Sequence, residues 1–157
     1  MQKIVPFLWF DGKAEEAMNF YVSIFKNSKV VSVTRYGDAG PGPKGSVMSA
    51  TFDLEGQRFY ALNGGPMYKF TPAISLFVNC ETQTEVDGLW EKLSQGGTQD
   101  PCGWLKDKYG VSWQVVPTIL GKLLGDKNPK KASKVMQAMM HMKKIDIQGL
   151  QQAYDQG

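Results

Sequence analysis

The sequence predicts an α+β protein built from two similar halves, and two observations support this. An apolar segment, a polar turn and an amphipathic helix occur at residues 6–21 and again at 75–90. Each half alone is too short to bury a sheet, so the halves are expected to lie side by side around a shared cleft. A lysine-rich tail of helical character follows the two halves and resembles neither.

The first half, assigned to residues 1–66, begins with a strand at residues 3–10, because this segment is apolar on both faces and rich in strand formers. A helix is expected at 14–25, where Glu15 and Glu16 in the first turn suit the helix dipole. Further strands are expected at 29–36, 46–54 and 57–63, with a Gly- and Pro-rich loop at 37–45 and a tight turn at Glu55-Gly56.

The second half, assigned to residues 67–117, repeats this order in shorter form. A strand is expected at 73–79 and a helix at 84–93, which Gly96-Gly97 terminates. Two further strands follow, at 103–106 and 111–116, around the turn at 107–110.

A helical C-terminal extension is expected at residues 118–157. Asn128-Pro129 is a helix start, because asparagine caps the N-terminus and proline is tolerated in the first helical position. Asp146 is expected to cap a last helix. Apolar stripes in both helices predict that the extension packs on its own sheet or on a second copy of the chain.

Charge and composition exclude several classes of protein. The net charge is +3, and the C-terminal lysines are spaced as on a solvated helix face, so no nucleic-acid partner is expected. Two cysteines make no disulfide framework. No apolar run reaches membrane-spanning length and no signal-type segment is present, so a cytoplasmic protein without a membrane partner is expected.

Four stretches resemble the PhnB-like branch of the glyoxalase/bleomycin-resistance/extradiol-dioxygenase superfamily (vicinal oxygen chelate fold): Phe10 to Tyr21, 74–78, Cys102 to Pro117 and Met142 to Ile147. Members of this branch often carry the description demethylubiquinone methyltransferase-like. The resemblance implies two βαβββ modules that form cupped mixed sheets with helices outside, in a homodimer.

The resemblance also implies where a metal would bind. In metal-binding members of the superfamily, His and Glu ligands come from the first and last strands of each module. Here Pro6 and Ser75 occupy the first-strand positions, and Gln114 stands where a glutamate is usual. His141, the only histidine, lies in the C-terminal extension, far in sequence from these strands. The sequence therefore predicts no metal and no other cofactor.

Other chemistries find little support in the residues. One histidine in the wrong region cannot complete a Ser-His-Asp set, and no base is identified for the Cys102 thiol. The glycine-rich loop at 37–45 joins two expected strands rather than a strand and a helix, so it does not match a nucleotide-type cofactor turn.

The leading hypothesis is a protein that binds a small organic molecule in the cleft between the halves, without a metal. The alternatives are a metal-dependent lyase or dioxygenase, a methyltransferase and a non-catalytic regulatory or structural dimer. Strand alternation places Gln114 in the cleft and Trp113 beneath the helix layer; Phe7, Trp9 and Trp90 are also expected in the core. The candidate ligand-binding residues are Leu8, Phe10, Tyr36, Phe59, Asn63, Ser75, Phe77, Cys102, Trp104 and Gln114.

Overall fold

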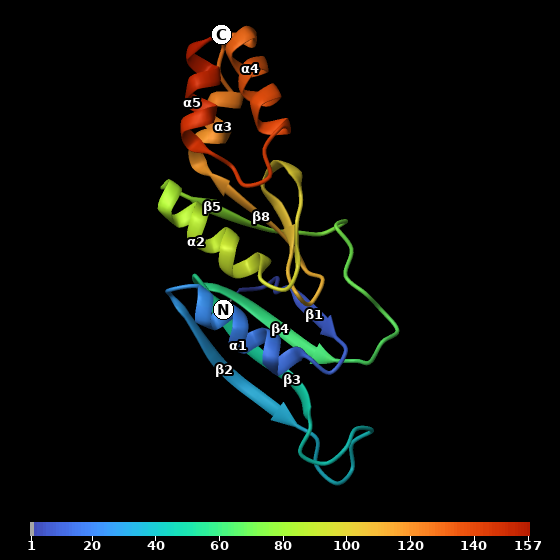
Figure 1. The fold of residues 1–157 in the computed structure, drawn as a ribbon. Coiled ribbons are helices and arrows are strands. Elements are labelled where there is room, and N and C mark those ends of the chain that lie inside the picture. Colours follow the sequence, from blue (N-terminus) through green and yellow to red (C-terminus); the bar gives the residue numbers. More distant parts are fainter. Residues whose placement is uncertain (1) are drawn as a thin grey trace. The chain divides into compact units, whose positions relative to one another are not determined.

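The structure of the protein is a computed structural model that describes residues 2–157. The chain divides into two compact units, one that ends at Lys69 and one that runs from Phe70 to Gly157 (Figure 1). Unit 2 therefore contains both the second module and the C-terminal extension.

Unit 1 is a four-stranded mixed sheet with one helix packed on it (Figure 1). The strand order is β1-β4-β3-β2, in which β1 is parallel to β4 and the other pairs are antiparallel. Its elements are β1 (Phe7–Phe10), α1 (Ala14–Ile24), β2 (Ser28–Arg35), β3 (Val47–Leu54) and β4 (Gln57–Asn63).

The core of unit 1 lies between the sheet and α1. Phe52 is fully buried, its ring stacks on Phe59 at 5.4 Å between centroids, and it also contacts Tyr21 of α1. We call the face of each sheet that packs on its own module's helix the covered face and the opposite one the open face.

Unit 2 repeats the topology of unit 1, which confirms the internal duplication. Its sheet has the order β5-β8-β7-β6, and β5 is parallel to β8. The sequence did not predict β6 or the 3-10 helix η1, since both are too short to show a period. The elements are β5 (Leu76–Cys80), α2 (Gln83–Ser94), β6 (Thr98–Gln99), η1 (Pro101–Gly103), β7 (Trp104–Lys106) and β8 (Ser112–Pro117).

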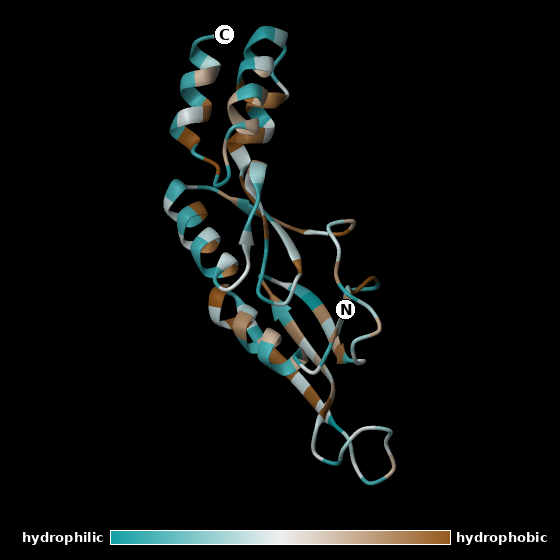
Figure 2. Ribbon diagram, turned by 45° about the vertical axis from the view of Figure 1, so that its right-hand side comes forward, coloured by the Kyte–Doolittle hydropathy of each residue, from teal (hydrophilic) through white to brown (hydrophobic). Residues whose placement is uncertain are grey.

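The extension forms three helices, α3 (Thr118–Leu124), α4 (Pro129–Met140) and α5 (Ile147–Asp155). Both predicted caps are present: the side chain of Asn128 accepts hydrogen bonds from the first N–H groups of α4, and Asp146 accepts one from Gln148 N. In Figure 2 these helices alternate teal and brown segments, as amphipathic helices do. Their apolar sides enclose a core of Val116, Leu120, Leu123, Val135, Ile145 and Leu150.

Two strands begin later than the sequence predicts. The first starts at Phe7, because Pro6 has no N–H to donate and only its carbonyl joins the sheet, accepting from Tyr60 N. The strand expected from Ala73 starts at Leu76. Among the described residues, no helix combines the length and apolar character needed to cross a membrane.

Candidate functional site

Three side chains from neighbouring strands form a row across the open face of the unit 2 sheet. Phe77 of β5 pairs with Gln114 of β8, and Gln114 pairs with Trp104 of β7. A neutral amide therefore lies between two aromatic side chains. Phe77 is 52% exposed, and Trp104 and Gln114 are partly exposed.

The polar atoms of this row are only partly used within the protein. Gln114 donates from Nε2 to the hydroxyl of Ser75 at 3.0 Å. Neither Oε1 of Gln114 nor the indole N–H of Trp104 has a hydrogen-bond partner within residues 2–157. Ser112, on the same face two residues before Gln114, carries a buried hydroxyl that is also unpaired within that range. The Ser112 hydroxyl is inaccessible, whereas the side chains of Gln114 and Trp104 are partly exposed and can offer hydrogen-bonding groups to a further molecule.

The opposite side of β8 is fixed by a buried aspartate. Asp107 accepts hydrogen bonds from Tyr109 N and Val111 N through Oδ1, and from the Trp113 indole through Oδ2. This closes the turn that the sequence predicts at 107–110 and locks Trp113, 2% exposed, against the helix side. The prediction that Gln114 and Trp113 lie on opposite faces is confirmed. The sequence did not predict this role of Asp107.

In unit 1 the strand phase, meaning which residues of a strand lie on which face of the sheet, is the reverse of the one expected. Leu8 and Phe10 pair with Ala61 and Asn63, on the covered face that also holds Phe59. Phe10 and Phe59 are 3% and 5% exposed. The expectation that Phe10 and Phe59 line a binding surface is therefore corrected, because both side chains are buried in the core of unit 1. Leu8 is partly exposed and lies on the same covered face.

The residues that do lie on the open face of unit 1 were missed. Phe7 contacts the Tyr60 ring edge-on at 5.5 Å, and Trp9 contacts Tyr68 at 5.0 Å. Phe7 and Trp9 were expected in the core, yet Phe7 is 56% exposed. The Trp9 indole donates to Gly65 O at 2.9 Å, so its polar atom is already bound.

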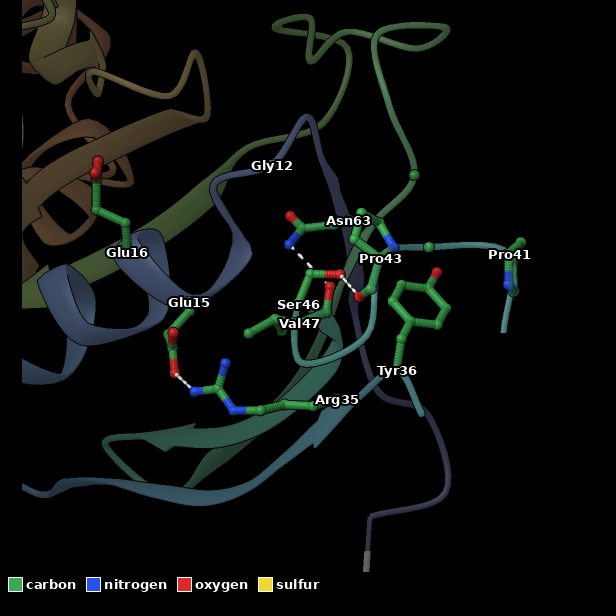
Figure 3. A pocket seen from close by; sticks show the side chains of 12 residues that line it. Gly12, Glu15, Glu16, Arg35, Tyr36, Pro41, Pro43, Ser46, Val47 and Asn63 are labelled. Carbon is green, nitrogen blue, oxygen red and sulfur yellow. Dashed lines mark hydrogen bonds and ion pairs between the residues drawn. The ribbon is translucent and has the colours of Figure 1, made fainter. Parts of the chain in front are cut away.

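Tyr36 and Asn63 line a separate pocket of about 740 Å³ at one end of the unit 1 sheet, beside the start of α1 (Figure 3). The Tyr36 ring lies against the loop that follows it: a Cβ at Gly40 or Gly42 would approach the ring to 2.4 Å. The loop at 37–45 therefore folds around this ring and depends on those two glycines.

The polar groups of this pocket mostly bind one another. Asn63 accepts from Ala14 N, which caps α1, and donates to Val47 O. Arg35 pairs with Glu15 at 2.8 Å and donates to Gly45 O. These contacts, drawn in part in Figure 3, close the end of the sheet and leave few groups for a ligand.

The two cysteines differ in their surroundings. Burial raises the pKa of the Cys80 thiol to about 12, so this side chain remains a neutral thiol in the core. Cys102 is partly exposed and lies in η1 directly before Gly103 and Trp104. Its side chain was a candidate ligand-binding residue, and this role stays a prediction.

The donor set does not fit a divalent metal ion. Pro6, Ser75 and Gln114 offer no imidazole or carboxylate, and His141 is exposed at the C-terminal end of α4. Among the described residues, no group of three or more His, Cys, Asp or Glu side chains is placed to hold an ion.

Comparisons with known proteins agree with this fold. The family model described as 3-demethylubiquinone-9 3-methyltransferase matches residues 2–116. The PhnB protein from Bacillus cereus is 48% identical, with a TM-score of 0.68; the match covers 74% of this chain and 100% of that one. No curated protein matches the chain.

Two more distant solved structures share the fold. A protein from Pseudomonas aeruginosa is 22% identical with a TM-score of 0.63, over 74% of this chain and 98% of that one. The fosfomycin resistance protein FosX from Listeria monocytogenes, solved with Mn(II) and sulfate, is 15% identical with a TM-score of 0.51, over 72% and 90%.

The family match ends at residue 116, so α3, α4 and α5 lie outside it. Within the matched range, both modules have the βαβββ order and the mixed sheets that the resemblance implied. The chain belongs to the PhnB-like family described as 3-demethylubiquinone-9 3-methyltransferase, on a glyoxalase/bleomycin-resistance-like fold.

Proposed function

We propose that this protein binds a small planar organic molecule on the open face of the unit 2 sheet, without a metal ion. The observation that carries the proposal is the row Phe77–Gln114–Trp104, which places one amide between two aromatic side chains. Ser75 supports the row from the side by accepting a hydrogen bond from Gln114.

The spacing of the row suits a flat ring. Neighbouring strands lie about 4.8 Å apart, so the backbones that carry Phe77 and Trp104 are separated by roughly 10 Å. Aromatic side chains at this separation can contact a planar molecule by stacking or by edge contacts. The oxygen Oε1 of Gln114 can accept from a ligand hydroxyl, and the Trp104 indole can donate to a ligand carbonyl.

The family description suggests which planar molecule to test. It names 3-demethylubiquinone, a quinone ring with carbonyl and hydroxyl oxygens, and these groups match the acceptor and donor of the row. A neutral ligand also matches the neutral amide of Gln114, which cannot offset the desolvation of a dication as a carboxylate could. We therefore propose a quinone-like ligand class.

The proposal is tested by titrating the purified protein with a short-chain ubiquinone and with its 3-demethyl form, using tryptophan fluorescence and calorimetry. Gln114→Ala is expected to raise the Kd by about 5- to 10-fold, the effect of losing one hydrogen bond, with little change in the unfolding midpoint. Gln137→Ala, an exposed glutamine on α4, is the matched control and should leave the Kd unchanged.

Three results would contradict the proposal. The first is no binding of either quinone to the unaltered protein. The second is a Gln114→Ala variant that loses stability as strongly as affinity, which would make this residue structural. The third, which bears on the metal alone, is a stoichiometric divalent ion found by elemental analysis of protein purified without chelators.

Methyl transfer is the second candidate, favoured by the family description alone. It requires a methyl donor such as S-adenosylmethionine to bind the same protein. Calorimetry with S-adenosylmethionine in the presence of the 3-demethyl quinone separates the two functions. Saturable binding of S-adenosylmethionine at one site per chain would support methyl transfer. The absence of a binding heat would leave quinone binding as the only proposed function.

A further inference from the structure

The segment between α4 and α5 docks against the turn that precedes Trp104. We call this segment, Met142 to Ile147, the strap. Cys102 and Gly103 donate their backbone N–H groups to the carbonyls of Met142 and Lys143, both at 2.8 Å. These two bonds link the extension directly to the residue before Trp104, the first residue of β7.

The turn held by the strap has an unfavourable backbone conformation. Cys102 has φ 64° and ψ 31°, and Gly103 has φ 82°, so two consecutive residues are left-handed. A residue with a side chain rarely adopts this conformation unless its surroundings hold it there. Gly103 is also closely packed, since a Cβ there would lie 3.0 Å from Val115 O and 3.1 Å from Ile145 Cγ1.

The strap is itself fixed from its other side by α2. The Gln83 side chain donates to Ile145 O at 3.0 Å and accepts from Ile147 N at 2.8 Å, so one amide binds two backbone groups of the strap. Lys144 pairs with Asp87 at 2.9 Å, and Ile145 is fully buried in the helical core.

We propose that the strap is a positioning element for Trp104, held in place by Gln83. It fixes the left-handed turn at Cys102–Gly103 and thereby the start of β7, so the aromatic end of the row Phe77–Gln114–Trp104 depends on the extension. The strap lies beyond residue 116, where the family match ends. The part that concerns ligand affinity rests on the proposed function; the part that concerns the conformation of Trp104 does not.

The test compares the full chain with Gln83→Ala and Ile147→Pro. Gln83→Ala removes both contacts of this side chain to the strap, together with the hydrogen bond that it donates to Asp87. Ile147→Pro removes the N–H that donates to Gln83 and replaces the partly exposed isoleucine side chain. Proline is tolerated there because Ile147 is the first residue of α5 and Asp146 is extended. Gln151→Ala, which loses only a bond to Asp155 on α5, is the matched control.

Two readouts do not require a ligand. Hydrogen exchange of the Cys102 and Gly103 amides is expected to accelerate about tenfold in both strap variants and not in the control. The ¹⁹F resonance of 5-fluorotryptophan at position 104, assigned with Trp104→Phe, is expected to shift or broaden, while the signals of the other three tryptophans, Trp9, Trp90 and Trp113, remain. Unchanged exchange and an unchanged Trp104 signal would overturn the proposal.

The ligand readout separates this proposal from the proposed function. If the unaltered protein binds the short-chain ubiquinone, both strap variants should raise the Kd by several-fold, and an unchanged Kd would overturn the link between strap and binding. If the unaltered protein binds neither quinone, the proposed function fails, and the exchange and ¹⁹F results still decide whether the strap positions Trp104.

Discussion

The two sheets have the same topology, but the side chains on their open faces differ in chemistry. In unit 1, the aromatic side chains pair with each other and the Trp9 indole binds Gly65 O. In unit 2, the Trp104 indole and the Gln114 oxygen have no partner within the described residues. A duplicated fold therefore does not duplicate a site: the capacity to bind depends on which polar atoms remain free for another molecule.

A charged pair lies on the open face of unit 1. Asp53 and Arg58 face each other across β3 and β4 on the open face of unit 1, with Nε to Oδ1 at 2.7 Å and Nη2 to Oδ2 at 3.3 Å. Each of these two side chains therefore has its charged partner within unit 1. In the row of unit 2 the central group is a neutral amide, and its nearest partner is a hydroxyl.

The largest expected effect tests which face of unit 1 is the core. Phe59→Ala should lower the free energy of unfolding by about 3–5 kcal/mol, because it removes a buried ring stacked on Phe52. Phe7→Ala should cost less than about 1 kcal/mol, because Phe7 is more than half exposed. Urea unfolding measures both. Equal losses would show that the strand phase described for unit 1 is wrong.

The next effect compares the turns that connect the last two strands of each unit. Asp107→Asn should cost about 2–3 kcal/mol, because an amide cannot accept from two backbone N–H groups and the Trp113 indole at once. Glu55→Gln, in the exposed turn of unit 1, keeps its acceptor oxygen for Lys26 N and should cost under about 1 kcal/mol. Thermal unfolding of both variants checks this difference. If Glu55→Gln loses as much stability as Asp107→Asn, the expectation is wrong.

The fold was predictable because its signals are local or repeated. The duplicated strand–helix order gave the topology class, and the caps at Asn128 and Asp146 gave two helix starts within one residue. In β8 the polar residues Ser112 and Gln114 alternate with Trp113 and Val115, so the phase of this strand could be read from the sequence.

The phase of unit 1 was mispredicted because β1 is apolar on both faces. A correct signal was present elsewhere: Ala50, Phe52 and Leu54 alternate with polar residues in β3. The two-residue turn Glu55-Gly56 then sets Phe52 opposite Phe59 and places both on one face. The parallel pairing of β1 with β4 spans the whole module, and no local pattern in the sequence fixes such a register.

A smaller effect separates the two tryptophans of the open faces. Trp104→Phe removes an indole N–H that has no partner in the described part of the chain, so stability should change little while the Kd for the short-chain ubiquinone rises by roughly 3- to 10-fold. Trp9→Phe should do the reverse: it loses the bond to Gly65 O, which lowers stability by about 1 kcal/mol. Calorimetry and urea unfolding of both variants provide the measurement. If Trp9→Phe raises the Kd and Trp104→Phe does not, the ligand binds on the open face of unit 1 instead.

The smallest expected effect concerns the acid limb of stability. The hydrogen bond from Arg58 holds the pKa of Asp53 below its ordinary value, so the folded state favours the carboxylate. Its contribution is therefore present above the ordinary aspartate pKa, near 3.8, and is lost as the pH falls through the lowered value. Asp53→Asn should be less stable than the unaltered protein at neutral pH, and this difference should shrink as the pH drops to about 3 and below.

The matched control for Asp53→Asn is Asp38→Asn, which removes an aspartate whose pair with Lys44 is largely exposed. Its stability difference should stay near zero at every pH, because exposed pairs contribute little. Asp87 of unit 2, whose pKa is also lowered by hydrogen bonds from Gln83 and Lys144, remains in both variants, so some acid sensitivity persists. If Asp53→Asn follows the same curve as Asp38→Asn, the charged pair does not stabilise unit 1, and the contrast between the two open faces rests on their aromatic residues alone.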